Sequence, residues 1–146
     1  MTLYDIIKGS LGKHMTLDAS VPASVGCAEA VSAILRLAGI NVPQRGIAST
    51  NALLVFCQAH PEIFTSISEP EQGALLISAT GTGNGKLSNG HTGFFGGFGV
   101  MYPDDWGICS NNSDSGLFLE LWNWTKWIAY FQKLGGMTPH IFRVKT

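Results

Sequence analysis

The chain has 146 residues, of which 45% are hydrophobic and 13% are charged, and nine Lys and Arg against ten Asp and Glu give a net charge of -1. This apolar, weakly charged composition excludes a disordered chain and predicts one domain over residues 1–146 with a single core. The balanced charge argues against nucleic-acid binding by bulk electrostatics and against a polybasic membrane surface.

The N-terminus lacks a basic segment followed by an apolar one, and the longest purely apolar run, residues 52–57, is far shorter than the roughly 20 residues of a spanning helix. We therefore expect no signal peptide, no membrane insertion and synthesis in the cytoplasm. Three widely spaced cysteines favour free thiols over a disulfide framework. The histidines form no pair at HxH or HxxxH spacing, so we expect no metal and no other cofactor.

The first half of the chain has the pattern of helices. Apolar residues recur at helical spacing over 2–15, and Thr2 with Asp5 has the form of a helix N-terminus. A strong amphipathic pattern predicts a second helix over 27–37. A Ser-Thr pair is expected to cap a third helix at about 51–59, and loops are predicted between the three.

The second half of the chain changes to strands and turns. A Gly-, Thr- and Asn-rich loop is predicted over 79–89, and a helix with an aromatic face over 122–134. Strands are predicted over 74–78, 91–101, 107–111, 117–121 and 140–144. Helices first and strands second indicate an α+β fold, with N-terminal helices packed on a small antiparallel β-sheet.

Cys27 begins the second predicted helix. Unpaired N–H groups and the positive end of the helix dipole stabilise a thiolate at this position, and a thiolate is a strong nucleophile. Cys27 is therefore a candidate for nucleophilic catalysis. The alternative is a small buried hydrophobic residue, which many free cysteines are.

His91 begins a predicted strand directly after the Gly-rich loop, where a general base within about 3 Å of the thiol could lie. The alternative is a polar residue with an ordinary hydrogen bond. A third polar group from the next strand can orient the imidazole. An Asn side chain could take this role. Ser110 and Asn112 share one face of that strand and Asn111 takes the other, so the sequence alone does not choose between Asn111 and Asn112, and turn chemistry is an alternative for 111–113.

The order of these motifs resembles the CHAP amidase/peptidase family. The segments concerned are G-C-A-E-A-V-S at 26–32, G-H-T-G at 90–93 and S-N-N-S at 110–113, and the resemblance runs from about Asp18 to Val144. Members are papain-like cysteine hydrolases related to the NlpC-type enzymes, and many cleave peptidoglycan. The resemblance implies a papain-like domain in which Cys27 is the nucleophile, His91 the base and Asn111 the orienting residue.

Five further residues are candidates for substrate binding. Each has a structural alternative: a turn-forming role for the aspartate, a solvated helix position or a salt bridge for the glutamate, loop or turn chemistry for the asparagines, and core packing for the tryptophan. The candidates are Asp18, Glu29, Asn84, Asn112 and Trp106.

The resemblance implies a peptidoglycan hydrolase that acts in the periplasm or cell wall, and we expect a phage lysin or a secreted antibacterial effector. A delivered effector would require an immunity protein as a partner. Two alternatives stay open. One is a cysteine protease or deamidase that acts on protein, and the other is a catalytically silent domain that binds wall fragments or a partner.

Overall fold

The computed structural model describes residues 1–16, 26–44, 46–81, 83–84 and 89–146. Its helices are α1 (Leu3–Ser10), α2 (Cys27–Leu37), α3 (Thr50–Ala59), α4 (Trp124–Trp127) and the π-helix η2 (Ile128–Leu134). Its strands are β1 (Phe64–Ile67), β2 (Leu75–Ser78), β3 (His91–Phe98), β4 (Trp106–Asn111), β5 (Phe118–Asn123) and β6 (Pro139–Val144). Within these ranges no helix combines the length and the apolar character needed to cross a bilayer.

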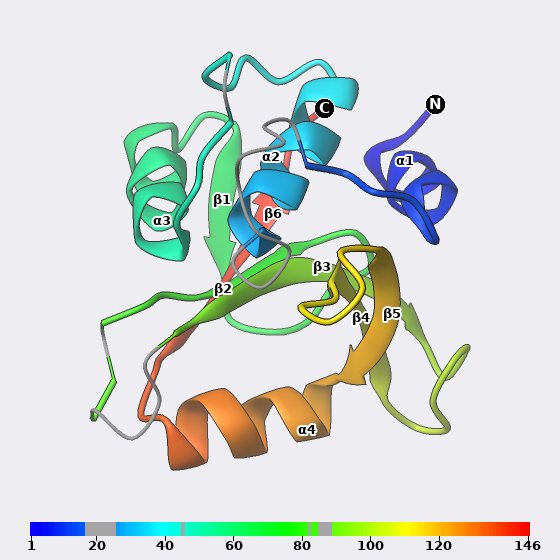
Figure 1. Ribbon diagram of the computed structural model, residues 1–146, viewed down its shortest axis with the longest axis vertical. Coiled ribbons are helices and arrows are strands. Elements are labelled where there is room, and N and C mark those ends of the chain that lie inside the picture. Colours follow the sequence, from blue (N-terminus) through cyan, green and yellow to red (C-terminus); the bar gives the residue numbers. More distant parts are fainter. Residues whose placement is uncertain (17–25, 45, 82, 85–88) are drawn as a thin grey trace.

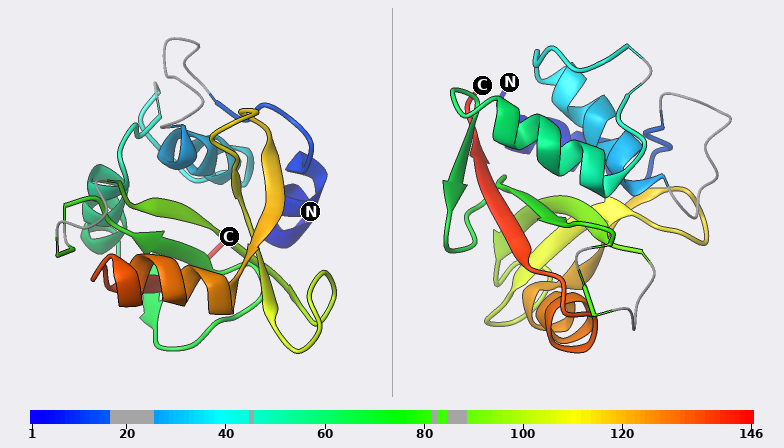
Figure 2. Two further views of the ribbon diagram at one scale, coloured as in Figure 1. Left: turned by 60° about the horizontal axis from the view of Figure 1, so that its bottom comes forward. Right: turned by 90° about the vertical axis from the view of Figure 1, so that its left-hand side faces the viewer.

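The strands form one sheet in the order β1-β6-β2-β3-β4-β5, and every neighbouring pair is antiparallel. Helices α1, α2 and α3 cover one face, whereas α4 and η2 cover the other (Figure 1). The same layers are visible from the side in Figure 2. The predicted α+β fold with N-terminal helices on an antiparallel sheet is confirmed.

Strand alternation divides the core into two hydrophobic clusters. Phe94 and Cys109 point toward the N-terminal helices and join the larger cluster. Phe95 and Ile108, one residue along in each strand, pack with Trp127 on the other face. Alternation therefore indicates which face the side chains at the start of β3 take, up to Phe95, before the register of the β3–β4 pair shifts.

Most predicted elements agree with the structure. Helix α2 has the predicted bounds, and the expected capping box of Thr2 and Asp5 is present. Helix α1 is shorter than the predicted 2–15 because Gly12 turns the chain with a φ of +83°. Strand β1 was not predicted.

The predicted helix over 122–134 is wrong in its beginning and in its type. Strand β5 continues to Asn123, whose side chain accepts the backbone N–H of Lys126 and caps α4. The chain then winds as a π-helix up to Leu134. This change in winding still keeps Trp127 and Phe131 against the sheet.

Candidate active site

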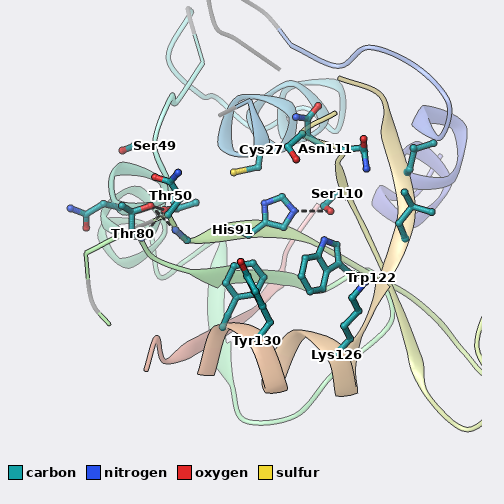
Figure 3. Close-up of a pocket in the computed structure, with 18 of the residues that line it drawn as sticks. Cys27, Ser49, Thr50, Thr80, His91, Ser110, Asn111, Trp122, Lys126 and Tyr130 are labelled. Carbon is teal, nitrogen blue, oxygen red and sulfur yellow. Dashed lines mark hydrogen bonds between the residues drawn. The ribbon is translucent and has the colours of Figure 1, made fainter. Parts of the chain in front are cut away.

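Cys27 and His91 line one cavity of about 780 Å³ between α2, the sheet and η2. Cys27 is the first residue of α2, after the N-cap Gly26, and it is half-buried. In Figure 3 the side chain of Cys27 lies on the α2 side of the cavity, above the imidazole ring of His91. The structure therefore brings together the two residues that the sequence nominated as nucleophile and base.

The imidazole of His91 is held by a serine. His91 is the first residue of β3, and its Nε2 lies 2.9 Å from Oγ of Ser110 on β4. The other ring nitrogen, Nδ1, faces the side of Cys27 (Figure 3). A hydrogen bond on one nitrogen leaves the other available for a proton from the thiol.

The expectation that Asn111 contacts His91 is corrected by this geometry. Ser110 has the parity of Ile108 and lies on the face of α4 and η2, where His91 also lies. Asn111 has the parity of Cys109 and is turned to the face of α2. Asn111 still lines the cavity and is only 3% exposed, but the hydrogen bond to the imidazole belongs to Ser110.

Aromatic rings surround His91 on the side away from Cys27. The ring of Trp127 is stacked at 5.3 Å and 27°, and that of Phe131 at 5.9 Å and 22°. Trp122 lies 6.1 Å away. The indole N–H of Trp127 donates to Oγ of Ser78, which is the register partner of His91 on β2, at 3.0 Å. The orientation of the imidazole is thus fixed by both packing and hydrogen bonding.

Burial shifts both candidate groups toward their neutral forms. It lowers the pKa of His91 to about 4. It also raises the pKa of the Cys27 thiol, while the backbone N–H groups of Thr92, Ala28 and Cys27 itself act in the opposite direction. The expected help from the start of the helix is therefore present but is outweighed by burial. At neutral pH a thiol faces a neutral imidazole, which suits general-base catalysis.

A network of hydroxyl groups forms the opposite end of the cavity. Oγ1 of Thr50, at the start of α3, lies 2.9 Å from Oγ1 of Thr80 and accepts the backbone N–H of Thr80 at the same distance. Oγ1 of Thr80 accepts the backbone N–H of Gly90, also at 2.9 Å. This network fixes the residue before His91 relative to α3.

The structure places the candidates for substrate binding in different environments. Asn112 lines the cavity, and its Oδ1 also accepts the backbone N–H groups of Asp114 and Ser115, so it serves the turn as well. Asp18 lies outside the described residues. Glu29 is 0% exposed on α2 and does not line the cavity, so the predicted solvated position is wrong.

Asn84 and Trp106 do not line this cavity. The backbone N–H of Asn84 donates to the carbonyl of Gly135, and its side chain donates to that of Leu134, so the residue fastens its loop to the end of η2. Trp106 packs edge-on against Phe95 at 6.0 Å, as the alternative of core packing predicted.

Sequence reasoning missed several residues of the cavity wall. These are Ser110 as partner of the base, and Trp122, Lys126 and Tyr130 along one side. The aromatic residues carried a signal, because an aromatic face was predicted for this segment, but nothing in the spacing indicated that it would pack on His91. The remaining thiols, Cys57 and Cys109, are buried and free, as predicted.

Among the described residues no group of three or more His, Cys, Asp and Glu side chains is arranged to hold a metal ion. The chain matches no model of a protein family and no curated protein sequence.

Proposed function

We propose that this protein is a cysteine hydrolase that cleaves an amide bond of bacterial cell-wall peptidoglycan. One observation carries the proposal: a cysteine at a helix N-terminus and a histidine whose Nε2 lies 2.9 Å from Oγ of Ser110 line the same cavity. Nucleophile, base and orienting group are the parts that covalent amide hydrolysis requires.

In the first step Sγ of Cys27 attacks the carbonyl carbon of the amide while Nδ1 of His91 takes the thiol proton. Nδ1 must be unprotonated for this, so the ring carries its hydrogen on Nε2 and donates it to Oγ of Ser110, 2.9 Å away. The lowered pKa of His91 keeps Nδ1 free at neutral pH. We assign the backbone N–H of Cys27, at the start of α2, to the oxyanion that forms on the carbonyl oxygen.

In the second step the imidazolium gives its proton to the leaving amine, the C–N bond breaks and an acyl thioester remains on Cys27. A water molecule then gives a proton to His91 and attacks the thioester carbonyl. The carbon–sulfur bond breaks, a carboxylic acid leaves, and the proton returns from His91 to the sulfur. The resting thiol and imidazole are restored.

The choice of peptidoglycan rests on the resemblance to the CHAP family over 26–32, 90–93 and 110–113. The bond is either the N-acetylmuramoyl–L-alanine amide or a peptide bond of the stem or cross-bridge. Such an enzyme works in the periplasm or cell wall, as a phage lysin or as a secreted effector. An effector would require an immunity protein in the producing cell.

Incubation with purified sacculi from several bacteria, followed by mass spectrometry of the soluble fragments, tests the proposal. We expect new muropeptides from the wild type and none from Cys27→Ala, because the nucleophile is lost. Cys57→Ala is the matched control, since Cys57 is a buried thiol that does not line the cavity. The masses of the products identify the bond.

One result would overturn the proposed substrate, and another would overturn the proposal that the protein is an enzyme. Failure on every wall, together with Cys27-dependent cleavage or deamidation of a protein, would move the substrate to protein. Failure on walls and on proteins alike would overturn the enzymatic proposal and favour a binding domain.

A further inference from the structure

One charged side chain lines the cavity among the residues that the structure describes, and it belongs to Lys126. No described Asp or Glu lines the cavity with it. Since the buried His91 is neutral near pH 7, the wall of the cavity carries a positive charge. A cavity with this charge favours an anionic ligand.

The ammonium group of Lys126 lies over Trp122 at the exposed rim of the cavity. Its Nζ lies 4.9 Å from the ring centroid of Trp122, a cation–π distance, and the Trp122 ring lies 6.1 Å from that of His91. The backbone N–H of Lys126 donates to Oδ1 of Asn123 at 2.8 Å. Figure 3 shows Lys126 and Trp122 together on the helix side of the cavity, with Trp122 between Lys126 and Ser110.

The fold itself offers the ammonium no acidic partner in the described part of the chain. The ion pair found there joins Arg143 to Glu71, on another part of the surface. Lys126 is the third residue of α4, a four-residue helix that continues directly into η2.

The environment of Trp122 favours a carboxylate over a sugar ring as the ligand here. Its indole packs against Trp127 at 5.6 Å and Phe131 at 5.2 Å, and the ammonium of Lys126 lies over the ring. A sugar would have to displace the ammonium in order to stack on that ring. A carboxylate would instead use the ammonium where it is, with up to three N–H donors.

We propose that Lys126 makes the enzyme selective for substrates that carry a free carboxylate near the scissile amide, on the side of Trp122 and Tyr130. This inference rests on the proposed function and adds a substrate class to it. Lys126 is then a specificity-determining residue, and the reaction itself still belongs to Cys27 and His91.

The test uses two forms of one wall fragment, a stem peptide with the α-carboxylate of D-glutamate free and the same peptide with a carboxamide there. Binding is measured by calorimetry in the Cys27→Ala background, so that no turnover interferes, and hydrolysis is measured in the Cys27 enzyme. The variants are Lys126→Gln, Lys126→Arg and, as a matched control, Lys133→Gln. Lys133 is exposed on η2 and does not line the cavity.

We expect the carboxylate form to bind about tenfold more tightly than the carboxamide, the size of one hydrogen bond to a charged group. The preference disappears in Lys126→Gln, persists in Lys126→Arg and Lys133→Gln, and shrinks as salt is added. The ratio of kcat/KM for the two forms follows the same pattern.

If the wild type hydrolyses the fragments and Lys126→Gln keeps the full preference for the carboxylate form, this inference is overturned and the proposed function stands. A wild type that prefers the carboxamide, or neither form, would do the same. A wild type that hydrolyses neither fragment nor any sacculus would overturn the proposed function, and the inference with it.

Discussion

Ser110 and Asn111 show how one position along a strand decides a role. Both are polar, both are 3% exposed and both line the cavity. Only Ser110 shares the face of His91, because side chains alternate along β4. The family resemblance favoured Asn111, and strand alternation showed that Ser110 and Asn111 lie on opposite faces. The register of β4 against β3 was needed to decide which of the two contacts His91.

Replacing Ser110 by alanine tests its positioning role. We expect Ser110→Ala to lower kcat about tenfold, equivalent to one hydrogen bond of about 1.4 kcal/mol, while KM changes little, because the imidazole loses its orienting partner but the cavity keeps its shape. Steady-state kinetics on the released wall fragments gives the split, and the imidazole ¹⁵N shifts report the tautomer of His91. The control is Ser66→Ala, an exposed position on β1.

A fall in the unfolding midpoint that accounts for the lost activity would assign Ser110 a structural role instead. Unchanged kcat and unchanged ¹⁵N shifts would contradict any role of Ser110 in holding the base.

At the scale of elements, a helix with a strong apolar repeat was predicted correctly, whereas a short strand and a π-helix were not. Helix α2 was predicted because its apolar residues repeat over three turns and Gly39 follows them. Strand β1 has four residues, two of them exposed, so its pattern is too short to be distinguished from a loop until β6 pairs with it. Nothing in 128–134 separates a π-helix from an α-helix.

The residues of the candidate site also fall into a group that the sequence indicated and a group that it did not. The sequence predicted Cys27 and His91 because each stands at the beginning of a well-patterned element. The packing of Trp127 and Phe131 on the imidazole depends on the winding of η2, which brings the far end of the chain to β3. Such contacts between distant segments leave no local pattern.

Two glycine-to-alanine substitutions should have opposite effects on the elements that carry the site. At Gly9, on the exposed side of α1, a Cβ would meet nothing within 4 Å, so Gly9→Ala should raise the free energy of unfolding by up to about 1 kcal/mol. At Gly93 a Cβ would lie 2.5 Å from the Cys109 carbonyl oxygen and 2.9 Å from Ser110 Cβ. Gly93→Ala should therefore push β4 away, cost roughly 1–3 kcal/mol and reduce hydrolysis.

Urea denaturation of both variants measures these changes, and the activity of Gly9→Ala serves as the control for the assay. Wild-type stability and activity in Gly93→Ala would show that β3 and β4 can separate without disturbing the contact between His91 and Ser110.

At the scale of the whole molecule, burial of His91 links stability to pH. The pKa of His91 is about 4 in the fold, against an ordinary value of 6.5. Between these values the unfolded chain binds a proton that the folded chain does not, so stability falls as the pH drops from 6.5 to 4. The full change is about 3 kcal/mol, from 1.36 kcal/mol per unit of pKa. Above pH 6.5 this contribution is constant.

Urea denaturation of the wild type and His91→Gln, at steps between pH 7.5 and pH 4, isolates this contribution. Other groups act in both curves: Arg143 holds the pKa of Glu71 below its usual range, and burial raises that of Glu120. The difference between the curves should shrink by about 3 kcal/mol toward pH 4. A constant difference would mean that His91 is protonated as readily in the fold as in water.

The two layers of helices also divide the reacting groups. Helices α2 and α4 lie on opposite faces of the sheet (Figure 2). Cys27 belongs to α2, whereas His91 belongs to β3 and packs against Trp127 of α4 and Phe131 of η2. Cys27 and His91 are far apart in the sequence and belong to different elements. The distance between the sulfur and the imidazole is therefore set by the packing of α2 against β3 and β4. A displacement of about 1 Å can cost two orders of magnitude in rate. A protein or small molecule that separates α2 from the sheet would thus inhibit the proposed hydrolysis allosterically, from outside the cavity and without competing with the substrate.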